Sequence, residues 1–266
     1  MTELNEAFLA HEYARNGYDM DLEEVHGLTM QLLDERPPVT EDRYICYTMD
    51  GSSGYSDIGR FVERTCFETF FNNTAEDMHA EYEQYEQASS FFLSIDTERQ
   101  VPSGALRVIR NSASGLKTIN DACESPLGLT DRSIREAHDI MSFDECWDVG
   151  TVAAMPGYGS GAVSIQLYRG MYLAAMRENV SHLVSIVDMN VLPRLTNYLG
   201  IPFVSLVDTK PFEYLGSKQS QAVYGYVPEF YNKMNRKRKY TIRGLLAKKA
   251  LDRLVVGTED HTHMGN

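Results

Sequence analysis

Residues 147–203 read WDVGTVAAMPGYGSGAVSIQLYRGMYLAAMRENVSHLVSIVDMNVLPRLTNYLGIPF, and this segment carries the clearest fold signal in the chain. Its beginning, residues 147–155, has the continuous apolar character of a strand that is covered on both faces. A loop with three glycines follows, and apolar residues at spacings of three and four then predict a helix over about residues 162–179. Many α/β proteins bind a phosphate-bearing cofactor with this order of strand, loop and helix.

The loop between this strand and helix is rich in glycine. Glycine allows sharp backbone turns at Gly157, Gly159 and Gly161, and Ser160 or the free amides at the start of the helix could donate to an anion. A tight connection that binds nothing explains the glycines equally well. The dinucleotide-binding pattern G-x-G-x-x-G and the P-loop pattern Gly-Lys-Ser/Thr are both absent, which disfavours both nucleotide-binding folds.

A second strand-helix-strand unit follows the long helix. An apolar strand is predicted at residues 182–187, a helix at 190–199, and a helix stop at Gly200 before the next strand. The order strand, glycine loop, long helix and strand, followed by N-x-x-x-x-x-x-N-Y-L-G-I-P-F, resembles the acyl-coenzyme A core of the GCN5-related N-acyltransferases (GNATs). This resemblance implies that Tyr198, just ahead of the Gly-hydrophobic-Phe turn, protonates the departing thiolate.

The rest of the chain fits a GNAT-like layout. The sequence predicts a strand at residues 43–49, helices at 57–71 and 75–87, a hairpin from 90–96 and 104–110, and a helix at 131–138 within the polar region 111–145. We therefore expect an α/β (α+β) fold with a mixed, mostly antiparallel central sheet and helices on both faces. The expected parts are an N-terminal helical extension (1–40), a GNAT-like acyltransferase domain (41–230), and a C-terminal basic helix with a disordered tail (231–266).

Two motifs indicate one branch of the superfamily. The order G-A-L-R-V-I-R, a polar excursion, then C-W-D-V-G-T-V-A resembles the acyl-homoserine-lactone synthases and N-acyl amino acid synthases. The resemblance assigns the hairpin arginine of that branch to Arg107 and its acidic residue to Asp148. The branch has a glutamate at the acidic position and an arginine three residues later, where this chain has Asp148 and Thr151. These two departures put a homoserine-lactone product in question.

The chemistry that the resemblance implies is attack of an amine on a thioester, which needs a base, a polarised carbonyl and an acid for the thiolate. Asp148, directly or through water, is the predicted base, with Glu145 and Asp144 as substitutes. Tyr198 is the predicted acid. Backbone amides of residues 151–154 would polarise the carbonyl where a neighbouring strand splays away. The predicted acceptor-binding residues are Arg107 and Trp147, and the predicted cofactor-binding residues are Thr151, Val152, Ala153, Ala154, Gly157, Tyr158, Gly159, Ser160, Gly161 and Ala162.

Three of these assignments have a structural alternative. Asp148 could be an ordinary strand-end carboxylate, since an aspartate needs a raised pKa or a water relay to act as a base near neutral pH. Tyr198 could be a core tyrosine of an amphipathic helix. Arg107 could form a structural salt bridge instead of a paired hydrogen bond to an acceptor carboxylate.

Length and composition allow one large domain or two small ones, with 266 residues, 43% of them hydrophobic and 24% charged. No apolar run is long enough to span a membrane, and the N-terminal residues lack the basic and apolar regions of a signal peptide, so we expect a cytoplasmic protein. The four cysteines have no C-x-x-C spacing and the seven histidines no metal-ligand spacing. No metal site is therefore predicted.

Charge is unevenly distributed along the chain, because the formal net charge is −13 while basic residues crowd into residues 233–253. A solvated helix end explains this segment, and so does a dock for an acidic partner such as an acyl carrier protein. The acidic body disfavours nucleic acid. The sequence thus predicts an N-acyltransferase that moves an acyl group from acyl-CoA, or from the phosphopantetheine of an acyl carrier protein, to the amine of a small molecule. The alternative is a non-catalytic GNAT-like protein that binds acyl-CoA or a protein partner in a regulatory role, and the oligomeric state stays open.

Overall fold

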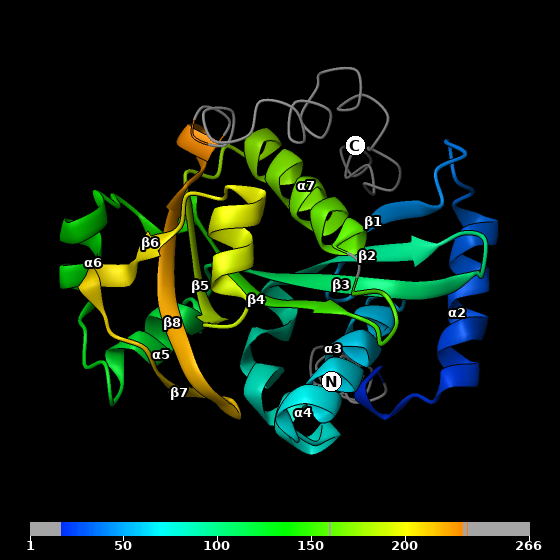
Figure 1. The fold of residues 1–266 in the computed structure, drawn as a ribbon, viewed down its shortest axis with the longest axis horizontal. Coiled ribbons are helices and arrows are strands. Elements are labelled where there is room, and N and C mark those ends of the chain that lie inside the picture. Colours follow the sequence, from blue (N-terminus) through cyan, green and yellow to red (C-terminus); the bar gives the residue numbers. More distant parts are fainter. Residues whose placement is uncertain (1–16, 160, 231–232, 234–266) are drawn as a thin grey trace, which may run out of the picture.

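A computed structural model describes residues 17–159, 161–230 and 233, without the side chain of Tyr198. Within these residues the strands form one sheet with the order β1-β2-β3-β4-β5-β8-β6, and β7 pairs with β8 (Figure 1). The strands are β1 (Tyr44–Asp50), β2 (Ser89–Asp96), β3 (Val101–Arg110), β4 (Cys146–Ala154), β5 (His182–Asp188), β6 (Val204–Ser205), β7 (Phe212–Tyr214) and β8 (Ser217–Tyr226). The helices are α2 (Leu22–Glu35), α3 (Ser56–Phe71), α4 (Ala75–Tyr82), α5 (Lys117–Cys123), α6 (Asp131–His138) and α7 (Ala162–Arg177), and the short helical turns are η1 (Glu83–Ala88), η2 (Phe143–Glu145), η3 (Arg194–Leu199) and η4 (Leu206–Asp208).

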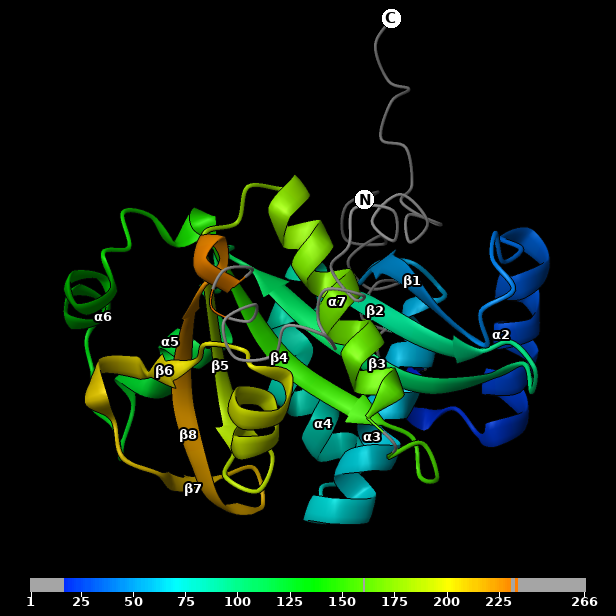
Figure 2. The ribbon, with the colours of Figure 1, turned by 45° about the horizontal axis from the view of Figure 1, so that its top comes forward.

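The sheet is mixed and mostly antiparallel, because only β4 and β5 pair in parallel. Helix α7 packs on one face, and α2 and α3 pack on the other (Figure 2). Side chains alternate between these two layers along each strand, as shown by Phe91 in the α3 layer and Phe92 in the α7 layer. The predicted fold class is confirmed.

Helix α7 forms where the sequence predicts the long helix, and its buried residues include Val163, Leu167 and Met171. Gly161 precedes the helix with a φ of 83°, in the left-handed region that glycine adopts readily. The helix ends at Arg177, two residues before the predicted end, because Asn179 takes a left-handed φ of 56° and the Val180 amide donates to the Ala175 carbonyl.

Two predicted helices are shorter or different in type. The helix expected at 75–87 ends at Tyr82 and continues as the 3-10 turn η1. The helix expected at 190–199 is only the π-helical turn η3 after Pro193, whose ring removes a backbone donor. No helix in the described part of the chain is long and apolar enough to cross a bilayer.

The described part of the predicted N-terminal extension contains α2, which begins with a capping box between Asp21 and Glu24. Val25 and Leu32 of α2 have no exposed surface and pack in the same layer as α3. The helix is therefore part of the core of the domain. Residues 1–16 and, except for Lys233, the predicted basic helix and tail at 231–266 lie outside the described residues.

Candidate active site

Strands β4 and β5 lie side by side at their beginnings and then part. Their ladder has three residue pairs and ends where Asp148 lies opposite Val184, although β4 continues to Ala154 and β5 to Asp188. Beyond that point each strand pairs only with its other neighbour, β4 with β3 and β5 with β8. Figures 1 and 2 show the two strands diverging. The splaying that the resemblance requires is therefore present.

A β-bulge in β4 accounts for this parting. Arg107 of β3 lies opposite Thr151, whereas the next residue, Val108, lies opposite Val149, which leaves Gly150 as an extra residue. A bulge bends its strand and increases the local twist, so β4 turns away from β5 directly after the ladder ends. The Ser185 hydroxyl donates to the Val149 carbonyl over 2.8 Å and joins the two strands at this point.

The open edge of β4 presents the amides of Val152 and Ala154. The amide of Met155 donates to the Ser103 carbonyl, so residues 151, 153 and 155 direct their backbone groups toward β3. The intervening residues 152 and 154 direct theirs to the opposite edge, where β5 no longer pairs. The Ala154 amide lies near the Cys66 thiol, and the Val152 amide is the donor at this edge that lies nearer to the end of the β5 ladder. Of the four predicted donors, two thus face the parting.

The glycine loop connects the end of β4 to α7. Gly157 and Gly161 have φ angles of 89° and 83°, and space around Gly159 is open, because an added Cβ would meet no atom within 4 Å. The Tyr158 hydroxyl donates to Asp96 over 2.9 Å, so this hydroxyl is engaged within the protein. No side chain among the described residues caps the N-terminus of α7, and Ala162 in its first turn is exposed. Ser160 lies outside the described residues.

Asp148 is fully buried on the face of β4 that contacts α5. Its carboxylate accepts hydrogen bonds from the backbone amide and, over 2.8 Å, from the hydroxyl of Thr118. Burial raises the pKa of Asp148 to about 7, although the Thr118 hydrogen bonds and the charge of Lys117 act in the opposite direction. This pKa suits a base near neutral pH, while the burial means that a proton reaches the carboxylate only through a relay or a local rearrangement.

The two substitute carboxylates lie away from the parting. Glu145 is half-exposed with its carboxylate 4.0 Å from the His182 ring, and Asp144 accepts hydrogen bonds from Asn111 and Ser142. Both residues lie in η2, before the paired beginning of β4. The structure therefore does not bring them to the open edge.

Arg107 is fully buried and forms the structural ion pair that was its alternative interpretation. Its guanidinium donates to Glu63, Glu86, Ser89 and the Tyr18 hydroxyl over 2.6–3.2 Å, which engages all five N–H groups. No donor remains for an acceptor carboxylate, in contrast to the expected role.

Trp147 is not available to a ligand either. Its side chain is 3% exposed and packs in the layer between the sheet and α7. The guanidinium of Arg110 lies 5.2 Å from the Trp147 ring, so this tryptophan has a cation–π partner within the chain.

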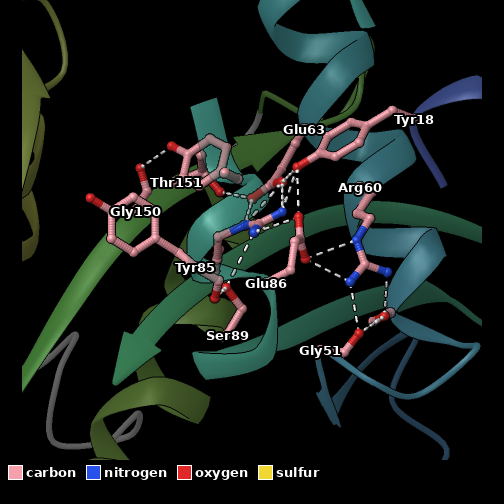
Figure 3. A network of polar contacts seen from close by, with 12 residues as sticks. Tyr18, Gly51, Arg60, Glu63, Tyr85, Glu86, Ser89, Gly150 and Thr151 are labelled. Carbon is pink, nitrogen blue, oxygen red and sulfur yellow. Dashed lines mark hydrogen bonds and ion pairs between the residues drawn. The ribbon is translucent and has the colours of Figure 1, made fainter. Parts of the chain in front are cut away.

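Glu63 and Tyr82 contact the bulge and were not singled out from the sequence. Glu63 of α3 has no exposed surface and accepts hydrogen bonds from the Thr151 hydroxyl and from Arg107 (Figure 3). The Tyr82 hydroxyl donates to the Gly150 carbonyl over 3.1 Å. One signal in the sequence could have identified Glu63. It lies four residues from both Gly59 and Phe67, so its carboxylate is on the same face of α3 as these two residues. A carboxylate that is buried on such a face needs a charged or hydrogen-bonding partner.

Tyr198 lies in η3, directly before the glycine-containing turn at Gly200, whose φ is 75°. Leu195 of the same turn packs in one cluster with Val149 of β4 and Leu167 of α7. The element that carries Tyr198 therefore packs in the same core layer as β4 and α7, while the side chain of Tyr198 lies outside the described residues.

Comparisons with known proteins support the fold. No protein-family model matches the chain, and no curated protein matches its sequence. Among solved structures, it is similar to FeeM, an N-acyl amino acid synthase from uncultured soil microbes, with 16% identity, a TM-score of 0.54, and coverage of 73% of this chain and 97% of that one. A CoA-dependent acyl-homoserine lactone synthase, BjaI, solved with SAM and isopentyl-CoA, has 12% identity, a TM-score of 0.49, and coverage of 83% and 95%. With the sheet order and the parted strands, the likeness to FeeM shows a GNAT-like fold.

Proposed function

We propose that the chain is an N-acyltransferase that moves an acyl group from an acyl thioester to the amine of a small molecule. The observation that carries this proposal is the parting of β4 from β5 after Asp148, next to a glycine loop that opens α7. The open edge of β4 would hydrogen-bond the pantetheine arm, and the loop and first turn of α7 would bind the diphosphate. The fold that the chain shares with an N-acyl amino acid synthase supports this assignment.

The proposed reaction forms one C–N bond and breaks one C–S bond. The Val152 amide polarises the thioester carbonyl, because it points to the open edge without a partner in β5. Asp148, whose pKa is raised to about 7 by burial, takes the proton of the attacking amine through a water relay. Tyr198 gives its proton to the leaving thiolate.

Acyl-donor binding tests the glycine loop directly. We expect CoA and acyl-CoA to raise the melting temperature, and an amine panel to release thiol from acyl-CoA. Gly159→Val should weaken donor binding and keep the fold, since the added side chain enters open space on the path of the phosphates. Calorimetry on both proteins measures the change. Unchanged affinity in the variant would mean that the loop is only a turn.

Tyr198→Phe tests the proposed acid. The variant should keep the fold and lower kcat for acyl transfer by roughly tenfold to a thousandfold, because the thiolate would leave unprotonated. Donor affinity should not change. The measurement is thiol release under saturating donor and acceptor, and an unaltered kcat would remove Tyr198 from the mechanism.

The second candidate is a non-catalytic GNAT-like protein that binds an acyl thioester or a protein partner in a regulatory role. One observation favours it, since the carboxylate of Asp148 is sealed from solvent by its contacts with Thr118. The assay above separates the two candidates. Donor binding without thiol release for any amine would select the regulatory protein.

The donor is either CoA or an acyl carrier protein. A carrier protein would dock on the basic residues 233–253, of which only Lys233 lies within the described part of the chain. Lys233 is exposed and pairs with Glu229. Comparing thiol release from CoA and carrier-protein thioesters of the same acyl group at low salt identifies the donor. A cytoplasmic location stays a prediction from the sequence.

A further inference from the structure

We propose that Glu63 and Tyr82 are positioning residues that hold the β4 bulge at Gly150 and thereby aim the Val152 amide at the thioester carbonyl. The proposal rests on the proposed function. It adds to it two side chains, from α3 and from the end of α4, that do not themselves contact the substrate.

The two contacts fall on consecutive residues of the bulge. Tyr82 is 1% exposed and donates to the carbonyl of Gly150, the extra residue. Glu63 is 0% exposed and accepts from the hydroxyl of Thr151, the residue at which the β3 pairing resumes. Together they restrain the main chain on both sides of the peptide bond between Gly150 and Thr151.

Glu63 and Tyr82 both contact Arg107. Arg107 lies opposite Thr151 in the sheet and donates to Glu63 over 2.8 and 3.0 Å. Its guanidinium also lies 4.3 Å from the ring centroid of Tyr82. Behind it, Glu86 accepts from both Arg107 and Arg60, which in turn donates to the Gly51 carbonyl. The bulge thus rests on a buried network that is anchored in β2, α3 and η1.

The position of the extra residue decides which amides face the open edge. Successive residues of a strand direct their backbone groups to opposite edges, so a bulge displaced by one residue reverses the direction of every amide between the old and new positions. With the extra residue at Gly150, Val152 points away from β3. An extra residue beyond Val152 would turn its amide toward β3 and remove the donor. The contacts of Glu63 and Tyr82 oppose this displacement.

Three variants test the proposal. Tyr82→Phe removes the hydroxyl that contacts Gly150, Thr151→Val removes the hydroxyl that contacts Glu63, and Thr151→Ser keeps a hydroxyl as a rescue. The matched control is Tyr85→Phe, because the Tyr85 side chain is likewise buried and its hydroxyl accepts from Asn120 of α5, not from a residue of the bulge. All variants are compared as full-length protein by kcat, by donor Kd, and by the carbonyl stretching frequency of a bound acyl-CoA in difference infrared spectra.

We expect Tyr82→Phe and Thr151→Val each to lower kcat by roughly tenfold to a hundredfold, up to the effect of losing one preorganised donor. The carbonyl frequency of the bound donor should move back toward that of the free thioester, while Kd changes less than threefold, a bound we set for the test. The variant that combines Tyr82→Phe with Thr151→Val should lower kcat by less than the product of the two single reductions. Thr151→Ser should recover most of the kcat, and Tyr85→Phe should resemble the parent.

A purely structural role of Glu63 and Tyr82 predicts different results. If melting temperatures fall but kcat and the carbonyl frequency of the folded variants stay at the parent values, the positioning proposal is overturned. Equal losses of kcat in Tyr85→Phe would overturn it as well. If the parent protein binds no acyl thioester, the proposed function itself fails, and the infrared measurement on the parent reveals this before any variant is compared.

Discussion

Replacing Arg107 by methionine should lower the free energy of unfolding by about 3–5 kcal/mol, the loss typical of removing one partner from a buried ion pair. Methionine has a similar length but leaves the carboxylates of Glu63 and Glu86 without the guanidinium that binds both. The side chain of Glu63 is 0% exposed, so water does not replace the lost partner. Urea unfolding at constant pH measures the difference.

Arg110→Met is the matched control for this prediction. Arg110 lies in the same strand and pairs with Glu178, but both side chains are more than a third exposed. An exposed pair contributes about 0–1 kcal/mol, and the contact of Arg110 with the Trp147 ring contributes roughly another 0.5–1 kcal/mol. The control should therefore lower the free energy of unfolding by less than Arg107→Met does. Equal effects at the two positions would mean that the buried network adds little beyond a surface pair.

Asp148→Asn should lower kcat for acyl transfer by roughly a hundredfold to ten-thousandfold, the range of a lost general base. The reaction needs Asp148 without its proton, and burial raises the pKa of this group to about 7. In the parent protein kcat should therefore rise as the pH increases through about 7 and then level off. The variant should lack this rise, and a pH profile of thiol release between pH 5 and 9 checks both statements.

The same substitution should have an effect on stability that depends on pH. The pKa of Asp148 is raised in the folded state from an ordinary value of 3.8 to about 7, so folding favours the protonated form. The stabilisation by this group is complete below about pH 4 and is lost as the pH rises to about 7, by up to about 4 kcal/mol for three pKa units. Asparagine does not titrate, so Asp148→Asn should gain stability relative to the parent between pH 5 and pH 8. If the difference in the free energy of unfolding between variant and parent is the same at pH 5 and pH 8, the raised pKa of Asp148 is contradicted.

Local patterns predicted the parts of the fold that depend on neighbouring residues. The buried face of α7 followed from apolar spacings of three and four, and Val163, Leu167 and Met171 are buried as predicted. The hairpin of β2 and β3 and the small helix α6 were predicted from turn and cap residues in the same way. Each of these signals is contained within about twenty residues of sequence.

At the candidate site, the role of each side chain depends on partners that are distant in the sequence. Arg107 meets Glu63, 44 residues earlier, and Asp148 meets Thr118, 30 residues earlier in a region without readable pattern. The extra residue Gly150 exists only in relation to the pairing with β3. The residue types were therefore visible in the sequence, but whether each faces a ligand or another side chain depends on the assembled sheet.

The three-pair ladder between β4 and β5 makes the sheet two half-sheets that share a short seam. Beyond this seam, the facing edges of both halves keep main-chain donors and acceptors that a longer ladder would have consumed. A pantetheine arm lying there would act as an additional strand that hydrogen-bonds to both half-sheets and joins them. The stability of the domain and its affinity for an acyl donor would then depend on the same backbone groups.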